Sequence, residues 1–178
     1  MEIRETAIPG CYEIIPKVFR DERGSFVKTF HHDTFAEHGL ATDWKEEFYS
    51  ISRKGVLRGL HFQLPPHDHA KLVYCTDGEV FDAVVDLRKE SPTFGCCTTK
   101  ELKSSTGNML YIPSGLAHGF YVLSSSATLV YKTSSIHAPS HDTGIRWNSA
   151  GIPWPDNTPI VSERDRNLAP FEVVASPF

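Results

Sequence analysis

Four side chains of the sequence, distant from one another in the chain, could together carry out acid–base chemistry. His61 supplies an imidazole that accepts or gives a proton near pH 7, and Asp165 supplies a carboxylate. Lys71 adds a cation and Tyr131 adds a phenol. Taken singly, each residue also has a purely structural interpretation: a buried histidine, a turn aspartate, a solvated lysine and a core tyrosine. Only a fold that brings them into one cavity makes them a base, an orienting carboxylate, a cation and a proton donor.

The arginine nearest to His61 in the sequence could bind an anion beside the base. A regular strand starting at Val56 would point Arg58 to one face and His61 to the other, because side chains alternate along a strand. A bulge or a local twist would turn both side chains to the same side. Without it, Arg58 is a surface residue and His61 a buried one.

A second pattern, in residues 107–118, has the spacing Gly-x5-Pro-x-Gly-x2-His and ends at His118. It resembles the second sequence motif of cupins, which are small β-barrels of the jelly-roll kind. In metal-binding cupins this last histidine is a ligand. His67 and His69 could complete a three-histidine site, which would suit a metal-dependent cupin oxygenase.

Two features of the sequence speak against that metal site. The positions three and four residues after His69, where a ligand glutamate is expected, hold Val73 and Tyr74. A Pro-Pro pair immediately before His67 favours a loop rather than the end of a strand. We therefore expect no metal.

The elements that must position these residues are mainly strands. Runs of β-branched and aromatic residues recur between turn residues, and the Asp77-Gly78 pair is a hairpin signal. One short helix is expected from Asp33 to His38, with Asp33 as its N-cap and Gly39 at its end. From Gly144 onward, tryptophans and prolines indicate an irregular segment packed on the body. The sequence predicts a single all-β domain over residues 1–178, a cupin-type jelly-roll barrel with short peripheral helices and an irregular C-terminal segment.

Composition and charge exclude several classes of protein. The 178 residues are 40% hydrophobic and 11% aromatic, which excludes disorder of the whole chain. A net charge of −4 without any Lys/Arg-rich block argues against a duplex nucleic-acid partner. The charged N-terminus leads into no apolar stretch, so we expect no signal peptide, no membrane span and a cytoplasmic location.

Eight sequence blocks, spread over nearly the whole chain, resemble the dTDP-4-dehydrorhamnose 3,5-epimerase family. In order, they are VLRGLHFQ, HAKLV, GEVFDAVVDLR, SPTFG, IPSGLAHGF, VLSSSATLVYK, GIRWN and SERD. The resemblance implies a cupin-type barrel that forms a homodimer and needs no metal or organic cofactor. It also implies a nucleoside-diphosphate 4-keto-6-deoxysugar as substrate, epimerised by proton removal beside the ketone and proton return to the opposite face.

The resemblance also assigns roles to the residues. His61 corresponds to the general base, Asp165 to the carboxylate that orients it, Lys71 to the cation beside the C4 oxygen, and Tyr131 to the proton donor on the other face. Residues that correspond to the substrate-binding set, with Arg23 and Arg58 suited to the diphosphate, are Arg23, Phe26, Lys28, Glu46, Phe48, Arg58, His118, His137, Asp142 and Arg164.

Departures from the family pattern concentrate where relatives hold the nucleobase. Lys28 stands where the family has Glu, Glu46 and Phe48 replace Gln and Asn, and His137 replaces a Tyr that stacks on thymine. Lys28 offers a donor in place of an acceptor, and Glu46 could accept from the amino group of cytosine. A CDP-linked sugar is therefore a candidate beside the dTDP-linked one.

Three further alternatives stay open at the level of sequence. Relatives with similar catalytic residues epimerise C3, C5 or both carbons. A 3,4-ketoisomerase of related cupin fold and a non-catalytic sugar-nucleotide-binding cupin are the other two. The complete set of base, carboxylate, cation and phenol argues against the binding protein, and the series of blocks from VLRGLHFQ to SERD fits the epimerases better than the ketoisomerase.

Overall fold

The structure, a computed structural model, describes residues 1–178 and consists mainly of β-strands. The strands are β1 (Glu2–Glu5), β2 (Tyr12–Ile15), β3 (Val18–Asp21), β4 (Gly24–Val27), β5 (Glu46–Arg53), β6 (Leu57–Gln63), β7 (Lys71–Asp77), β8 (Glu79–Asp86), β9 (Cys97–Lys103), β10 (Met109–Ile112), β11 (Leu116–Val122), β12 (Ser126–Thr133) and β13 (Asp142–Gly144). The short helices are α1 (His32–Glu37), α2 (Glu163–Arg166) and the 3-10 turn η1 (Phe171–Val173). The all-β prediction is confirmed. No helix is both long enough and apolar enough to cross a membrane.

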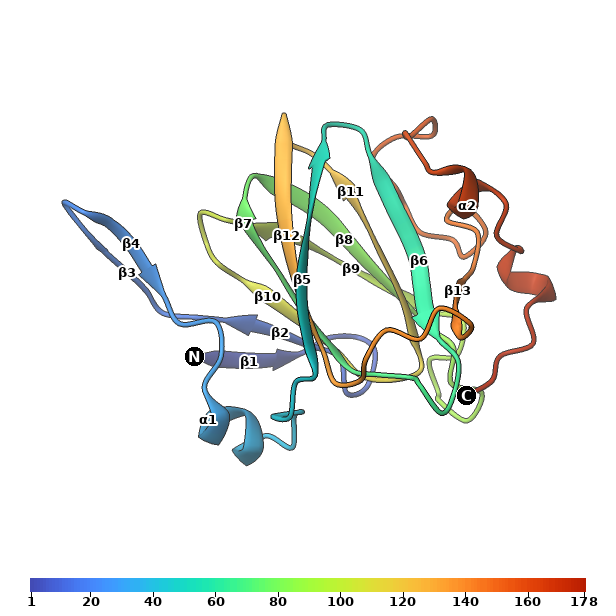
Figure 1. Cartoon of the computed structure of the whole chain (residues 1–178), viewed down its shortest axis with the longest axis horizontal. Coiled ribbons are helices and arrows are strands. Elements are labelled where there is room, and N and C mark those ends of the chain that lie inside the picture. Colours follow the sequence, from blue (N-terminus) through green and yellow to red (C-terminus); the bar gives the residue numbers. More distant parts are fainter.

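Two antiparallel sheets face each other and enclose the main core (Figure 1). One sheet has the order β1-β2-β10-β7-β12-β5, and the other has the order β13-β6-β11-β8-β9. Apolar residues from both sheets meet between them, among them Val73 and Leu129 from the first and Val84 and Phe120 from the second. This arrangement follows from the alternation of inward and outward side chains along each strand.

The outer faces of the two sheets are covered by different segments. Phe35 of α1 packs with Leu72 and Met109 on the outside of the six-stranded sheet. The C-terminal segment packs on the outside of the five-stranded sheet, where Ile145 and Ile152 join Leu60. The prediction of an irregular C-terminal segment packed on the body is confirmed, and this packing brings α2 against β6.

Two local predictions need correction. The Asp77-Gly78 turn does not join a hairpin, because β7 and β8 belong to different sheets and the chain crosses from one to the other at this turn. Helix α1 begins one residue earlier than expected, and its N-cap is His31, whose ring nitrogen accepts from the Thr34 backbone N–H. An imidazole nitrogen can replace the expected carboxylate as the capping acceptor. Gly39, with φ of 67°, follows the helix as predicted.

Strands β3 and β4 form a separate two-stranded hairpin. It projects away from the two sheets (Figure 1). Phe19 and Phe26 pack on each other there with ring centroids 6.3 Å apart, yet they stay 50% and 63% exposed. The hairpin therefore leaves apolar side chains without cover in the single chain.

Candidate active site

A cavity of about 750 Å³ opens at one end of the space between the sheets. Strands β6, β11 and β13 contribute to one wall, and β5, β7 and β12 contribute to the other. Eleven of the fourteen predicted site residues line this cavity. They are Glu46, Phe48, Arg58, His61, Lys71, His118, Tyr131, His137, Asp142, Arg164 and Asp165.

A bulge in β6 turns Arg58 and His61 to the same cavity. His118 of β11 lies opposite His61, while Phe120, two residues on, lies opposite Arg58, three residues away. The extra residue sits at Gly59, whose φ is 129° and where a Cβ would lie 2.5 Å from the Cα of Gly119. Only glycine fits this backbone and this close approach. The bulge that the sequence left as one alternative is thus present.

His61 and Asp165 form a hydrogen-bonded pair at the wall formed by β6. His61 Nε2 lies 2.7 Å from Asp165 Oδ1, and Oδ2 of the same carboxylate accepts from the Gly59 N–H at 3.1 Å. The Ser162 hydroxyl caps α2 by accepting from the Asp165 N–H. Burial alone would raise the pKa of Asp165, but the hydrogen bonds from His61 and Gly59 hold it below its usual range. An ionised Asp165 fixes the proton of neutral His61 on Nε2 and leaves Nδ1 to accept a proton.

Lys71 opens β7 on the facing wall, and its Nζ donates to the backbone oxygen of His61 at 3.2 Å. Burial lowers its pKa to about 8, although Asp142 and Asp82 favour the charged form. The ammonium of Lys71 therefore lies beside His61 and has donors left for another acceptor.

Tyr131 lies on β12, in the sheet opposite the one that carries His61. Its hydroxyl lies 3.2 Å from Ser50 Oγ, and its ring stacks on Phe48 with centroids 4.8 Å apart and planes 15° apart. Burial raises its pKa above the ordinary value, so the phenol keeps its proton at neutral pH. The cavity thus has an imidazole on one wall and a protonated phenol on the other.

A charged cluster lines the cavity beside Lys71. Arg164 and His137 both contact Asp142 Oδ2, at 2.9 Å and 3.4 Å. Burial favours protonation of Asp142, but Arg164 and His137 hold the pKa of this carboxyl below its usual range. Glu46 Oε2 accepts from the His137 backbone N–H at 3.0 Å. These contacts bring one end of β5 and the segments on either side of β13 together.

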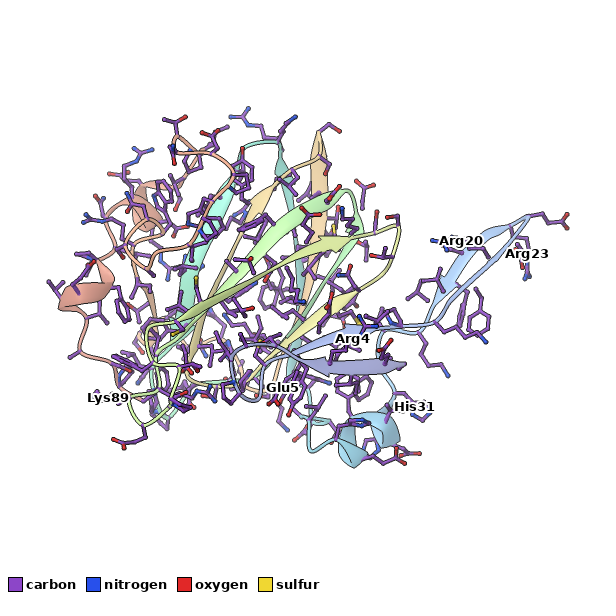
Figure 2. The ribbon with its side chains drawn as sticks, turned by 180° about the vertical axis from the view of Figure 1, so that it is seen from behind. Arg4, Glu5, Arg20, Arg23, His31 and Lys89 are labelled. Carbon is purple, nitrogen blue, oxygen red and sulfur yellow. The ribbon has the colours of Figure 1, made fainter.

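Arg23, Phe26 and Lys28 do not line this cavity, contrary to the simplest expectation for substrate-binding residues. All three belong to the β3–β4 hairpin or the residue following it. Figure 2 shows Arg23 near the outer end of the hairpin, far from the two sheets, where it pairs with Asp21. The hairpin pairs with no strand of the two large sheets, so strand pairing does not bring these residues to the cavity.

The three histidines of the metal alternative do not form a ligand cluster. His67 packs against the His141 ring, His69 lies within hydrogen-bond distance of Gln63 and Ser135, and His118 binds Asp82. His67 and His69 lie in the loop between β6 and β7, as the Pro-Pro pair indicated. The geometry that a three-histidine cupin site requires is not built here.

Sequence reasoning missed several side chains that border the cavity or support it. Ser50 and Gln63 line it, and Asp82, which does not line it, forms a hydrogen bond with His118. Asp82 carried a recognisable signal, because it is a charged residue within the apolar run of β8. Ser50 gave none, since a serine in an edge strand is ordinary.

Comparisons with known proteins agree over almost the full length of the chain. The profile of the family described as dTDP-4-dehydrorhamnose 3,5-epimerase matches residues 5–172. The protein of that name from Shigella flexneri is 45% identical over 96% of both chains, and the one from Methanothermobacter thermautotrophicus is 42% identical over 94% of this chain and 92% of its own. A dTDP-4-dehydrorhamnose 3-epimerase from Streptomyces niveus is 39% identical over 94% and 82%.

Solved structures show the same fold. The crystal structure of the 3,5-epimerase from Legionella pneumophila in complex with dTDP-4-keto-L-rhamnose has a TM-score of 0.93 and 35% identity, over 98% of this chain and 94% of that one. The 3,5-epimerase from Elizabethkingia anophelis has a TM-score of 0.91 and 39% identity, over 97% of both chains. The jelly-roll prediction is confirmed. The chain belongs to the dTDP-4-dehydrorhamnose 3,5-epimerase family and is a sugar-nucleotide epimerase.

Proposed function

We propose that this enzyme epimerises a dTDP-linked 4-keto-6-deoxyhexose at C3, C5 or both carbons. One observation carries the proposal: a carboxylate-bound imidazole and a protonated phenol line opposite walls of one cavity, with an ammonium beside the base. Inversion of a carbon needs proton carriers on both faces of the sugar ring. A single carrier would return the proton to the face it came from.

The chemical step uses only groups of this chain. Nδ1 of His61 takes the proton from the carbon next to the C4 ketone. The electron pair of the broken C–H bond forms a C=C bond, and the C4 oxygen becomes an enolate, which Lys71 stabilises. Tyr131 then gives its proton to the same carbon from the opposite face, the C=O bond re-forms, and the phenolate and imidazolium return to their resting states through solvent.

The cytidine alternative loses support from the position of Glu46, because its Oε2 already accepts from the His137 backbone N–H. Matching relatives, moreover, are named for dTDP-linked sugars. Thymidine is therefore the base that we assign to the substrate.

We further propose that the enzyme works as a homodimer in which the hairpin of one protomer completes the site of the other. Arg23, Phe26 and Lys28 do not line the cavity of their own chain, and Figure 2 shows Arg23 near the outer end of the hairpin. The exposed Phe19–Phe26 pair gives the hairpin an apolar face that a partner would cover. In this arrangement Arg23 of the partner and Arg58 bind the diphosphate from two sides.

Solvent exchange measured by NMR tests the activity. In heavy water, wild-type enzyme incorporates deuterium at C3, C5 or both carbons of dTDP-4-keto-6-deoxyglucose, and the labelled positions identify which carbons react. His61→Ala should abolish the exchange, because no other residue is placed to take the proton. Wild-type enzyme that binds the sugar nucleotide without any exchange would show a binding protein instead. Migration of the ketone to C3 would show a 3,4-ketoisomerase.

Mixing two variants tests the homodimer. Arg23→Ala damages the site that the hairpin enters, and His61→Ala damages the site of its own chain. After co-expression, mixed dimers hold one site with neither change, so activity should exceed the sum of the two variants measured separately. Activity no greater than that sum, in dimers shown to be mixed by mass spectrometry, contradicts a shared site.

A further inference from the structure

Asp82 of β8 is a buried carboxylate with an incomplete set of hydrogen bonds. Its residue is 0% exposed, and Oδ2 lies 2.8 Å from His118 Nε2. Oδ1 is buried and has no hydrogen-bond partner in the protein. A buried carboxylate oxygen without a partner is costly, so its presence points to a use beyond packing.

The strand order makes Asp82 and His118 a second carboxylate–imidazole pair, next to the pair of Asp165 and His61. β11 lies between β8 and β6, and His118 is the direct cross-strand neighbour of His61. Directly opposed residues point to the same face of a sheet. The two imidazoles therefore stand side by side, one with Nε2 on Asp165 and the other with Nε2 on Asp82.

This pairing determines which nitrogen of His118 is available to a ligand. The Nε2–H group donates to Asp82. Nδ1 has no hydrogen-bond partner in the protein, and it is not a buried atom. His118 lines the cavity. In the neutral ring, Nδ1 is an acceptor for a sugar hydroxyl group.

The carboxylate of Asp82 also acts on the opposite wall through its charge. Lys71 is half-buried, and desolvation lowers its pKa. Asp82 and Asp142 are the two carboxylates that favour its charged form. Burial raises the pKa of Asp82 itself, while His118 and Lys71 oppose this rise. Charged and titratable groups that line the cavity from the surrounding elements are Glu46, Arg58, His61, His69, Lys71, His118, Tyr131, His137, Asp142, Arg164 and Asp165.

We propose that Asp82 is a positioning residue for the epimerisation: it holds His118 with Nδ1 free for the sugar and places a carboxylate in the sheet that faces Lys71. The catalytic part of this inference rests on the proposed function. Its two physical parts, the tautomer of His118 and the protonation of Lys71, exist in the unliganded protein and can be measured there.

The test uses Asp82→Asn, which keeps the shape of the side chain and removes its charge. Lysine ¹³Cε signals should show the Lys71 pKa falling below about 8, and the basic limb of the kcat profile should move to lower pH with it. The kcat value should drop about 10-fold to 100-fold, the usual effect of losing one hydrogen bond to a charged group, with a smaller change in KM.

Asp86→Asn is the matched control. Asp86 lies on the same strand, is equally buried and binds Arg88, Ser91 and Thr93 away from the cavity. This change should lower the free energy of unfolding and leave the Lys71 titration and the kcat profile as in the wild type. A purely structural role of Asp82 would give the same pattern for both variants.

Two results would overturn the inference. One is a folded Asp82→Asn protein with an unchanged Lys71 titration. The other needs no variant and decides the matter even if Asp82→Asn fails to fold: ¹⁵N NMR of the wild type showing neutral His118 protonated on Nδ1. Absence of solvent exchange in the wild type would instead overturn the proposed function and leave both NMR results valid.

Discussion

Raising the pH through the pKa of Lys71 should change activity and stability in opposite directions. The ordinary lysine pKa of 10.5 is lowered to about 8 by burial. This difference corresponds to roughly 3 kcal/mol between the two protonation states. Below pH 8 the folded protein carries the full cost of a buried ammonium. Between about pH 8 and 10.5 the unfolded chain binds more protons than the folded one, so the free energy of unfolding rises with pH.

Activity should fall over the same range, because a neutral amine stabilises an enolate less well than an ammonium. The assay combines solvent exchange of the substrate by NMR with urea unfolding at pH 7, 8.5 and 10. Lys71→Met separates this lysine from other titrating groups. It should be more stable than wild type at pH 7 by up to about 3 kcal/mol, and the difference should shrink as the pH rises. Its exchange rate should be about 100-fold to 1,000-fold lower.

Lys54→Met, at an exposed lysine outside the cavity, is the control and should leave both properties unchanged. Equal unfolding free energies for wild type and Lys71→Met at all three pH values would refute the assignment of a costly buried cation. Exchange that continues undiminished at pH 10 would refute its role at the enolate.

Four further results are expected. Tyr131→Phe should keep deuterium exchange and slow inversion, seen by NMR of the product; inversion at the wild-type rate would remove the phenol from the mechanism. Asp165→Asn should lower kcat by about 100-fold to 10,000-fold in steady-state kinetics with little change in KM, because the amide no longer accepts from both His61 and Gly59. Gly59→Ala should destabilise the fold by at least about 1–3 kcal/mol in urea, since φ is 129° and a Cβ would meet the Gly119 backbone. Turnover of dTDP-4-keto-6-deoxyglucose should exceed that of the CDP analogue, and the reverse preference would restore the cytidine hypothesis.

The sequence predicted much of the fold because the hydrophobic pattern of its strands is regular. Alternating residues in β12 and the apolar runs of β8 and β11 mark strands that pack on one or both faces. The hairpin predicted at the Asp77-Gly78 turn was wrong, because β7 and β8 belong to facing sheets. The sequence of a tight turn is the same whether the two strands pair with each other or not. The N-cap of α1 was predicted two residues too late, at Asp33, because the observed cap His31 is not among the residue types preferred at that position.

The types of chemical group at the site could also be read from the sequence, but their arrangement could not. His61, Lys71, Tyr131 and Asp165 were identified by type and by their motifs. Arg58 reaches the cavity because of the bulge at Gly59. Arg23 lies away from it because the hairpin projects from the two sheets (Figure 2). Asp82 stood out as a charged residue within the apolar run of β8, but its contact with His118 depends on the pairing of β8 with β11, which the sequence does not show.

Residue types and their periodicity predicted an all-β chain that carries an imidazole, a carboxylate, an amine and a phenol. The tertiary structure decided which of them meet: it set His61 and Tyr131 on facing sheets, brought Asp165 to His61 from 104 positions away, and directed the hairpin outward. The physical reason is that hydrophobic patterning is local along the chain, whereas the pairing of strands and the packing of the C-terminal segment depend on contacts between distant residues.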